Sequence, residues 1–391
     1  MKAQFWANRR TRYSVITGGA AVIAAAAAAV ALTTPSGAAP HKTAAAGPHV
    51  KLISSSCSGP AGAAYVSDAG WDGFDAINTA NCDIIQVYNV DDTAVQGFSD
   101  DYNYSSTDEG IAIHGDELYF ADTGTNTVSA IDTADLDPSN YNPSETDIHV
   151  GFNPQELAVS PDGTQLWVAN TGPQAGQSSP VSISVINTAT DKVTATLRAS
   201  GSPLNVAFSP SGADAYVLTD RGLYVYSTTT DRVVKVVSNV GDPHGIAVSA
   251  DGKYVYVTDT TSNTLKVIST DGYRVTASIG VGDLPWSVVV SSDGKTAYVA
   301  NPDSDSISVI NTATDKVSDT IDVAGGPSEL ALTADGSQLW TTEITNAYTT
   351  VIDTAGDSVV GSLNLGDDGA NSGDGYGPNG IVLSTTPTPG S

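Results

Sequence analysis

Residues 154–170 read Pro-Gln-Glu-Leu-Ala-Val-Ser-Pro-Asp-Gly-Thr-Gln-Leu-Trp-Val-Ala-Asn. This stretch begins with an apolar run around a small residue, Ala158, and passes through Ser-Pro-Asp-Gly. It then ends in a second apolar run around an aromatic residue, Trp167. Asp-Gly between two apolar runs is a strong hairpin signal. The stretch therefore predicts two short antiparallel strands.

The same phrase returns along the chain, starting at Glu109, Pro203, Pro243, Pro285 and Pro327. The central small residues of the successive copies are 46, 49, 40, 42 and 42 residues apart: Ala112, Ala158, Ala207, Ala247, Val289 and Ala331. A period of this length indicates a repeat architecture. Each hairpin is followed by a Val-Ile-Asn-Thr type run, an Ala-Thr-Asp-Lys type turn and a fourth short run, as at 183–197. Each unit therefore predicts four strands.

A seventh unit is divided between the two ends of the chain. Residues 378–384 supply only its opening phrase, and residues 65–88 supply only its remainder. The strands are apolar on both sides, so each sheet must be covered on both faces, which radial stacking achieves. We therefore expect a ring closed by its own termini. The aromatic residue in each second strand is expected to pack between sheets: Tyr65, Tyr119, Trp167, Tyr216, Tyr256, Tyr298 and Trp340.

The repeat wording resembles the YVTN β-propeller family. It is written most clearly by Ala-Val-Ser-Ala-Asp-Gly at 247–252, Tyr-Val-Thr-Asp at 256–259 and Ser-Asn-Thr-Leu at 262–265. The resemblance covers residues 61–384. It implies an all-β, seven-bladed propeller of four-stranded antiparallel blades, with strand a at the C-terminus and strands b–d at the N-terminus in the split blade. Members of that family are exported or associated with surface layers, and the resemblance implies no particular activity.

The ends of the chain predict export. Residues 1–39 combine a basic start, an Ala-rich apolar segment and small residues suited to cleavage, which is typical of a signal peptide. An uncleaved anchor is the alternative, and twin-arginine export stays open beside the general route. Residues 40–60 read as a flexible lead-in and residues 385–391 as a disordered tail. With the signal removed we expect a secreted or envelope-associated monomer without a membrane segment.

The composition excludes some partners and favours a disulfide. The 391 residues hold 43 acids and 16 bases, a formal net charge of -27. Such a chain repels phosphate, so nucleic acid is not an expected partner. The only two cysteines, Cys57 and Cys82, are expected to pair in an exported protein, with two free thiols as the alternative.

Candidate ligand groups fall where the chain enters each innermost strand, because these positions ring one mouth of the central channel. The first position of each unit varies while the rest of the repeat is constant, as at a site grafted on a scaffold: Glu109, Gln155, Leu204, His244, Trp286, Ser328 and Asn379. Drift of solvent-exposed loop residues is the alternative explanation. The second position varies too: Gly110, Glu156, Asn205, Gly245, Ser287, Glu329 and Gly380. We predict ligand contacts for Gln155, Asn205, Trp286, Ser328, Asn379 and, from a neighbouring loop, Trp71.

Three functions follow from these residues. The favoured one is a non-catalytic binding protein whose mouth takes a protein, glycan or small-molecule ligand. The second is a lyase or lactone-type hydrolase that uses His244 with Glu109, Glu156 and Glu329 for acid–base chemistry, since Pro243-His244-Gly245 is similar to the wording of streptogramin B lyases. The third is a structural surface-layer module.

Two Gly-rich acidic insertions beside the split blade suggest calcium as a possible cofactor, because carboxylates on such turns are typical ligands of hard cations. The candidate ligands are Asp100, Asp101, Asp367, Asp368 and Asp374. A solvated acidic loop is the alternative. Polar residues that end the second strands, such as Asn170 and Asp259, are expected to satisfy backbone amides of the following turn.

Overall fold

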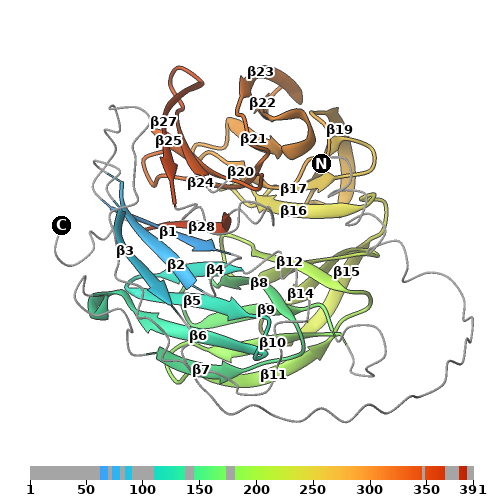
Figure 1. Ribbon diagram of the computed structural model, residues 1–391. Coiled ribbons are helices and arrows are strands. Elements are labelled where there is room, and N and C mark those ends of the chain that lie inside the picture. The colour runs from blue at the N-terminus through green and yellow to red at the C-terminus, as the bar shows by residue number, and fades with distance from the viewer. Residues whose placement is uncertain are drawn as a thin grey trace, which may run out of the picture. The chain divides into compact units, whose positions relative to one another are not determined.

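A computed structural model describes residues 62–68, 73–79, 84–89, 110–136, 145–172, 181–345, 348–365 and 378–384. The chain divides into two compact units, 1–49 and 50–391, and all of the described residues lie in the second. They form seven four-stranded antiparallel sheets, the blades of a propeller (Figure 1).

The bounds of the strands follow the predicted units, from the innermost strand of each blade outward. Blade 1 holds β4 (Ile111–His114), β5 (Glu117–Asp122), β6 (Thr127–Asp132) and β7 (Glu145–His149). Blade 2 holds β8 (Pro154–Val159), β9 (Gln165–Asn170), β10 (Ser182–Asn187) and β11 (Lys192–Arg198). Blade 3 holds β12 (Pro203–Phe208), β13 (Asp214–Thr219), β14 (Gly222–Ser227) and β15 (Arg232–Val237). Blade 4 holds β16 (Pro243–Val248), β17 (Tyr254–Asp259), β18 (Thr264–Ser269) and β19 (Arg274–Gly280).

The remaining blades are built in the same way. Blade 5 holds β20 (Val288–Val290), β21 (Thr296–Asn301), β22 (Ser306–Asn311) and β23 (Lys316–Asp322). Blade 6 holds β24 (Pro327–Leu332), β25 (Gln338–Glu343), β26 (Tyr348–Asp353) and β27 (Ser358–Asn364). Blade 7 is the split blade, with β28 (Pro378–Ser384) innermost, then β1 (Ala63–Asp68), β2 (Gly73–Asn78) and β3 (Ile84–Asn89). Short 3-10 helices lie at Thr133–Asp135 and Pro302–Ser304.

The ring is closed in the way that the divided seventh unit predicts. Each innermost strand contacts the next, in the order β4, β8, β12, β16, β20, β24, β28 and back to β4 (Figure 1). β28 pairs antiparallel with β1, which joins the two ends of the described chain in one sheet. The expectation of a seven-bladed propeller closed by its termini is confirmed.

The hydrophobic core consists of seven clusters, one between each pair of neighbouring blades. The aromatic residue of each second strand lies in such a cluster and is at most 4% exposed. Trp167 of blade 2, for example, packs edge-on against Phe208 and Tyr226 of blade 3. The predicted packing between blades is confirmed, and burial of these large rings holds the blades together.

The turn between the first and second strands explains the repeated Ser-x-Asp-Gly. In blade 2 the Gly163 N–H donates to the Ser160 carbonyl (2.8 Å), and the Asp162 carboxylate accepts from the Ser160 hydroxyl (2.7 Å). Gly163 has a φ of +71°, which is costly for a residue with a Cβ. The Thr188 hydroxyl at the end of β10 donates to the Gly163 carbonyl and ties the turn to the third strand.

Candidate functional site

Predicted mouth residues of five blades sit on β-bulges. In β8 the pairing with β9 jumps from Pro154 to Leu157, in β16 the pairing with β17 jumps from Pro243 to Ile246, and in β24 the pairing with β25 jumps from Pro327 to Leu330. The residues left out of the ladder are 155–156, 244–245 and 328–329. β12 shows a shorter jump past Leu204, and β28 a jump past Asn379. Bulges commonly re-aim side chains beside functional sites.

Hydroxyl groups on the second strands hold these bulges. In blade 4 the Gly245 N–H donates to the Thr258 hydroxyl (2.7 Å), which itself donates to the Trp286 carbonyl of blade 5 (3.0 Å). In blade 6 the Glu329 N–H donates to the Thr342 hydroxyl (3.1 Å). The hydroxyls therefore compensate for hydrogen bonds that the ladder loses.

In the split blade a serine has the same role. The Gly380 N–H of β28 donates to the Ser67 hydroxyl of β1 at 2.8 Å. This bond joins two residues that are 313 positions apart in the sequence, so the bulge contact also closes the ring.

Two predicted mouth residues lie in direct contact. The imidazole of His244 stacks on the indole of Trp286, with ring centroids 3.4 Å apart and planes inclined by 32°. Trp286 is 5% exposed, whereas His244 is half-buried. β20 begins only at Val288, and Leu284 in the segment before it has a left-handed φ of +55°. The indole thus packs against the imidazole, and His244 is the more accessible of the two.

The other predicted mouth residues differ in accessibility. Ser328 is 2% exposed, and its hydroxyl lies 2.8 Å from the Thr342 hydroxyl. Gln155, Glu156, Asn205 and Glu329 are half-buried. Asn205 accepts from the Val206 N–H (2.8 Å), which fixes its side chain against its own strand.

Neighbouring inner strands approach very closely at the mouth. The Gly110 N–H donates to the Gln155 carbonyl at 2.6 Å, and a Cβ at Gly110 would collide with that peptide. Gly245 lies in the same way against the Trp286 backbone. Glycine at this second position thus allows blades 1 and 2, and blades 4 and 5, to pack backbone to backbone.

The carboxylates predicted to act with His244 are not its neighbours in the ring. Glu156 lies in blade 2 and Glu329 in blade 6, and one blade separates each of them from blade 4. The inner segments beside His244 carry Leu204 and Asn205 on one side and Trp286 and Ser287 on the other. The structure thus brings His244 together with Trp286, and the flanking blades offer no carboxylate at these mouth positions.

Several candidate residues lie outside the described residues. These are the acid–base candidate Glu109, the loop residue Trp71, the proposed calcium ligands Asp100, Asp101, Asp367, Asp368 and Asp374, and the expected disulfide partners Cys57 and Cys82. The segments expected to be the signal peptide, the lead-in and the tail lie outside the described residues as well. Asn379 belongs to β28, whose backbone is described. Among the described residues no group of three or more His, Cys, Asp or Glu could hold a metal ion.

Polar residues at the ends of the second strands have the expected structural role. Asp122 accepts from the Gly124 N–H (2.7 Å), and Asp259 accepts from the Asp242 N–H (3.1 Å). Asp259 also forms a 3.2 Å ion pair with Lys266. Asn170 donates to the Ser182 carbonyl (3.3 Å). These side chains satisfy groups of the following turn and strand and, for Asp259, also of the segment that enters blade 4.

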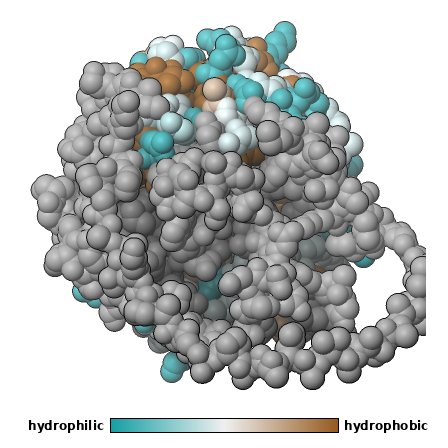
Figure 2. All heavy atoms as spheres, in the orientation of Figure 1, coloured by the Kyte–Doolittle hydropathy of each residue, from teal (hydrophilic) through white to brown (hydrophobic). Residues whose placement is uncertain are grey.

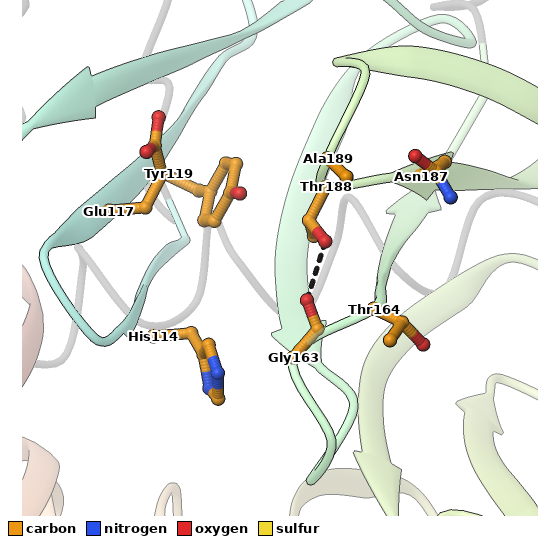
Figure 3. Close-up of a pocket in the computed structure, with 8 residues that line it drawn as sticks. All are labelled: His114, Glu117, Tyr119, Gly163, Thr164, Asn187, Thr188 and Ala189. Carbon is orange, nitrogen blue, oxygen red and sulfur yellow. Dashed lines mark hydrogen bonds between the residues drawn. The ribbon is translucent and has the colours of Figure 1, made fainter.

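A second site, which the sequence did not predict, lies between blades 1 and 2 at the opposite end of the blades. It is an open pocket of about 310 Å³ lined by His114, Glu117, Tyr119, Gly163, Thr164, Asn187, Thr188 and Ala189. Figure 3 shows His114, Glu117 and Tyr119 of blade 1 facing the turns of blade 2. One feature of the sequence could have indicated this pocket. The first residue of the second strand is the acid Glu117 in blade 1, whereas it is Gln in blades 2 and 6.

This pocket is electronegative. Burial, with contributions from the Asp191 and Asp132 carboxylates, raises the pKa of Glu117 above its ordinary value. Burial also raises the pKa of Asp191. The pKa of Tyr119 rises for the same reasons, mainly burial and then the charges of Glu117 and Asp191. The ion pairs of the described bases that the structure shows lie elsewhere, with Asp251, Asp259 and Asp293.

The described surface is mixed in character. In the space-filling view, hydrophilic and hydrophobic side chains alternate where described residues are visible (Figure 2). Within the described ranges no helix is long and apolar enough to cross a membrane.

The comparisons with known proteins agree with this fold. Residues 74–289 match the family model described as the Choice-of-anchor I domain. That description indicates a protein of the cell surface or extracellular space, and the YVTN-like wording of the repeats is compatible with it. No curated protein matches the chain significantly.

Three solved structures share the propeller fold at low sequence identity. A functionally unknown protein from Desulfotomaculum acetoxidans is 16% identical, with a TM-score of 0.65 over 82% of this chain and 98% of that one. Hydrazine synthase of Kuenenia stuttgartiensis is 19% identical, with a TM-score of 0.60 over 74% of this chain and 92% of that one. The dihydro-heme d1 dehydrogenase NirN is 16% identical, with a TM-score of 0.55 over 82% of this chain and 69% of that one. Identities this low establish a shared architecture alone.

Proposed function

The chain belongs to the choice-of-anchor I domain family, and on that premise we propose that it is an exported, non-catalytic binding propeller of the cell envelope or extracellular space. Its ligand docks at the mouth of the central channel. The observation that carries this proposal is the row of bulges, which removes residues 155–156, 244–245 and 328–329 from the ladder. In a ring with only a structural role, we would expect similar side chains at these positions, because the backbone of each bulge is held in the same way.

The chemistry of the mouth favours a hydroxyl-rich, uncharged ligand, and we propose an oligosaccharide. Gln155, Glu156, His244 and Glu329 are half-buried groups that accept or donate hydrogen bonds. Neither of the two mouth positions is Lys or Arg in any of the blades. Hydroxyl groups satisfy such a ring of acceptors, whereas anionic ligands would be repelled by an acidic chain.

Binding is favoured over proton transfer by the arrangement around His244. A general acid–base pair needs its groups within hydrogen-bond reach of the same reacting atom. The blades that flank His244 carry Leu204, Asn205, Trp286 and Ser287 at the mouth. Trp286 supports the imidazole by stacking, which fixes its position for a ligand contact.

The test is a glycan array followed by calorimetric titration of residues 40–391 with the best oligosaccharide. We expect His244→Ala, Glu156→Gln and Glu329→Gln each to weaken affinity by about tenfold, the value of one hydrogen bond to a charged or well-placed group. Asp271→Asn is the matched control, because this exposed carboxylate lies in the turn between β18 and β19 at the opposite end of blade 4. Equal affinity in all four variants would place the ligand elsewhere.

A further inference from the structure

The outermost strand of each blade has one edge that pairs with no other described strand. The N–H and C=O groups along such an edge can pair with a strand of another molecule. Figure 1 shows two of these strands, β15 and β23, at the rim of the ring. In blades 2 to 6 the outermost strand has a β-bulge in its pairing with the third strand, so these strands can be compared residue by residue: β11, β15, β19, β23 and β27.

β15 is apolar where most of the corresponding strands carry hydroxyl groups. At the bulges of blades 2, 4 and 5, the hydroxyls of Thr194, Thr276 and Ser318 each donate to a carbonyl of the third strand at 3.2 Å. β15 has Val234 there, which is 54% exposed. Two positions later β15 has Val236, which is also exposed. The other four strands have a hydroxyl at that position: Thr196, Ser278, Thr320 and Ser362.

The same strand of blade 3 is basic. Lys235 lies between the two valines, and Arg232 begins the strand. Both bases are exposed, and within the described ranges neither forms an ion pair. A lysine on an edge strand discourages pairing with other strands. An acid opposite that lysine in a partner strand turns the same charge into an attraction. The edge of β15 therefore favours an acidic partner strand.

One outermost strand of the same chain has the complementary charge. At the position of Lys235, β23 has Asp319, which forms no ion pair with another described residue. β23 ends at Asp322, whereas β15 begins at Arg232. Of the five strands compared, only β15 and β23 are exposed at each of their first five residues. The other three strands have small uncharged residues at the position of Lys235: Ala195, Ala277 and Gly361.

We propose that β15 of one molecule pairs antiparallel with β23 of a second copy, with Lys235 opposite Asp319. Arg232 then lies at the end of the strand pair where the second copy has Asp322. Pairing of β15 with another β15 would bring four bases together without an acid in either strand. Because β15 and β23 are different surfaces, one such contact leaves a β15 and a β23 available for further molecules. The expected assembly is therefore a chain or ring of molecules instead of the monomer expected from the sequence.

This contact is separate from the mouth, because two strands lie between the outermost and innermost strands of each blade. A single strand pair buries less surface than a standard interface, so we expect weak and reversible association. The experiment is sedimentation equilibrium of residues 40–391, which contain every described strand, from about 5 to about 500 μM at about 0.15 M ionic strength. The weight-average mass should rise with concentration above that of one chain. A mass that stays at one chain over this range would overturn the proposal.

Charge reversal identifies the two strands. Lys235→Asp and Asp319→Lys each place like charges opposite one another, so each variant alone is expected to stay monomeric. An equimolar mixture of the two variants has opposite charges in both contacts between unlike molecules, and it is expected to associate like the wild type. All of these side chains are exposed, so the melting temperatures should stay near that of the wild type.

Lys192→Asp is the matched control, because it makes the same change of charge at an exposed residue of β11. It is expected to associate like the wild type. Loss of association in Lys192→Asp equal to that in Lys235→Asp would show that only the overall charge matters, and the proposal would be wrong. It would also be wrong if Asp319→Lys alone still associated, because another surface would then face β15, or if the mixture stayed monomeric.

Val234→Thr tests the apolar part of the contact. It keeps the volume of the side chain and gives blade 3 the hydroxyl that blades 2, 4 and 5 have at the bulge. We expect association to weaken by about fivefold, without a lower melting temperature. Thr194→Val makes the reverse change on β11 and is expected to leave association unchanged. Association of Val234→Thr equal to that of the wild type would show that β15 does not form the contact.

Discussion

The His244 imidazole lies on the Trp286 indole with ring centroids 3.4 Å apart, and this stack joins the inner segments of blades 4 and 5. Trp286 was expected to contact ligand directly, yet only 5% of it is exposed. Its ring belongs to the interior beside the mouth, and His244, the residue that it packs against, is the proposed ligand contact.

We therefore predict that Trp286→Ala acts first on stability. Removing a buried tryptophan typically costs about 3–5 kcal/mol, because apolar burial is lost and a cavity remains. Urea unfolding of Trp286→Ala should show a lower midpoint, and His244→Ala a much smaller change. Equal midpoints for the wild type and Trp286→Ala would mean that the indole contributes little packing.

The hydroxyl of Thr258 is predicted to support the bulge. It accepts from the Gly245 N–H and donates to the Trp286 carbonyl, and the residue is fully buried. Thr258→Val keeps the volume but leaves both backbone groups unsatisfied, at a cost of about 1–3 kcal/mol. Thr258→Ser retains the hydroxyl and should recover most of that loss in urea unfolding. If serine were no better than valine, the lost methyl rather than the hydrogen bonds would be responsible.

The fold could be predicted from the sequence because the repeating residues include those of the turns as well as those of the strands. The left-handed glycine after Ser-Pro-Asp at 160–162 and the split between 65–88 and 378–384 fix the strand order and ring closure. Both depend on local chain chemistry, so a single sequence displays them.

The site could be predicted only in part. The mouth positions follow from topology, and their bulges coincide with the residues that vary. Trp286 is buried and lies before the late start of β20, a departure from the other blades that the repeat pattern does not reveal. The pocket between blades 1 and 2 is formed by residues of different units, such as Glu117 and Thr188. A sequence reader would have found it only by comparing the first residue of the second strand in one unit with the turn between the third and fourth strands of the next unit.

Gly163 and Gly294 form a matched pair for testing the inner turn. Both have a φ of +71°, but a Cβ at Gly163 would collide with the His114 imidazole, whereas a Cβ at Gly294 would meet nothing within 4 Å. Gly294→Ala should cost about 1–2 kcal/mol, the strain of the left-handed conformation. Gly163→Ala should cost more, because His114 must also move. Urea midpoints that coincide for the two variants would show that His114 yields without cost.

The pH dependence of stability should reveal the acid pair. Burial and the charges of Asp191 and Asp132 raise the pKa of Glu117 above its ordinary 4.5, with Tyr119 and His114 also lining this pocket. The folded state therefore binds this proton more tightly than the unfolded chain. The contribution of Glu117 to stability is therefore complete at pH values below its ordinary pKa. It is lost as the pH rises through the raised pKa of the folded state.

Glu117→Gln removes that titration, so its stability relative to the wild type should increase as pH rises from about 4 to about 7. Asp251 provides the opposite sign, because hydrogen bonds from Lys253 lower its pKa to about 2. The contribution of Asp251 to stability is present at pH values above its ordinary pKa of 3.8. It disappears as the pH falls toward the lowered pKa of the folded state. Urea unfolding of the wild type, Glu117→Gln and Asp251→Asn at each pH would separate the two. A pH-independent difference between Glu117→Gln and the wild type would contradict the raised pKa.

Ring closure gives the last prediction, because β28 supplies the inner strand of blade 7 from the far end of the chain. Without it, β1 loses its pairing with β28, and Ile381 is lost from the core between blades 6 and 7. A chain ending at residue 377 should therefore lose cooperative unfolding, whereas a chain ending at residue 384 should unfold like the full chain. Ser67→Ala is the milder test, since it removes only the acceptor for the Gly380 N–H, at a cost of about 1–3 kcal/mol. A cooperative transition in the chain ending at 377, at the full-length midpoint, would show that six blades and a three-stranded seventh close the ring unaided.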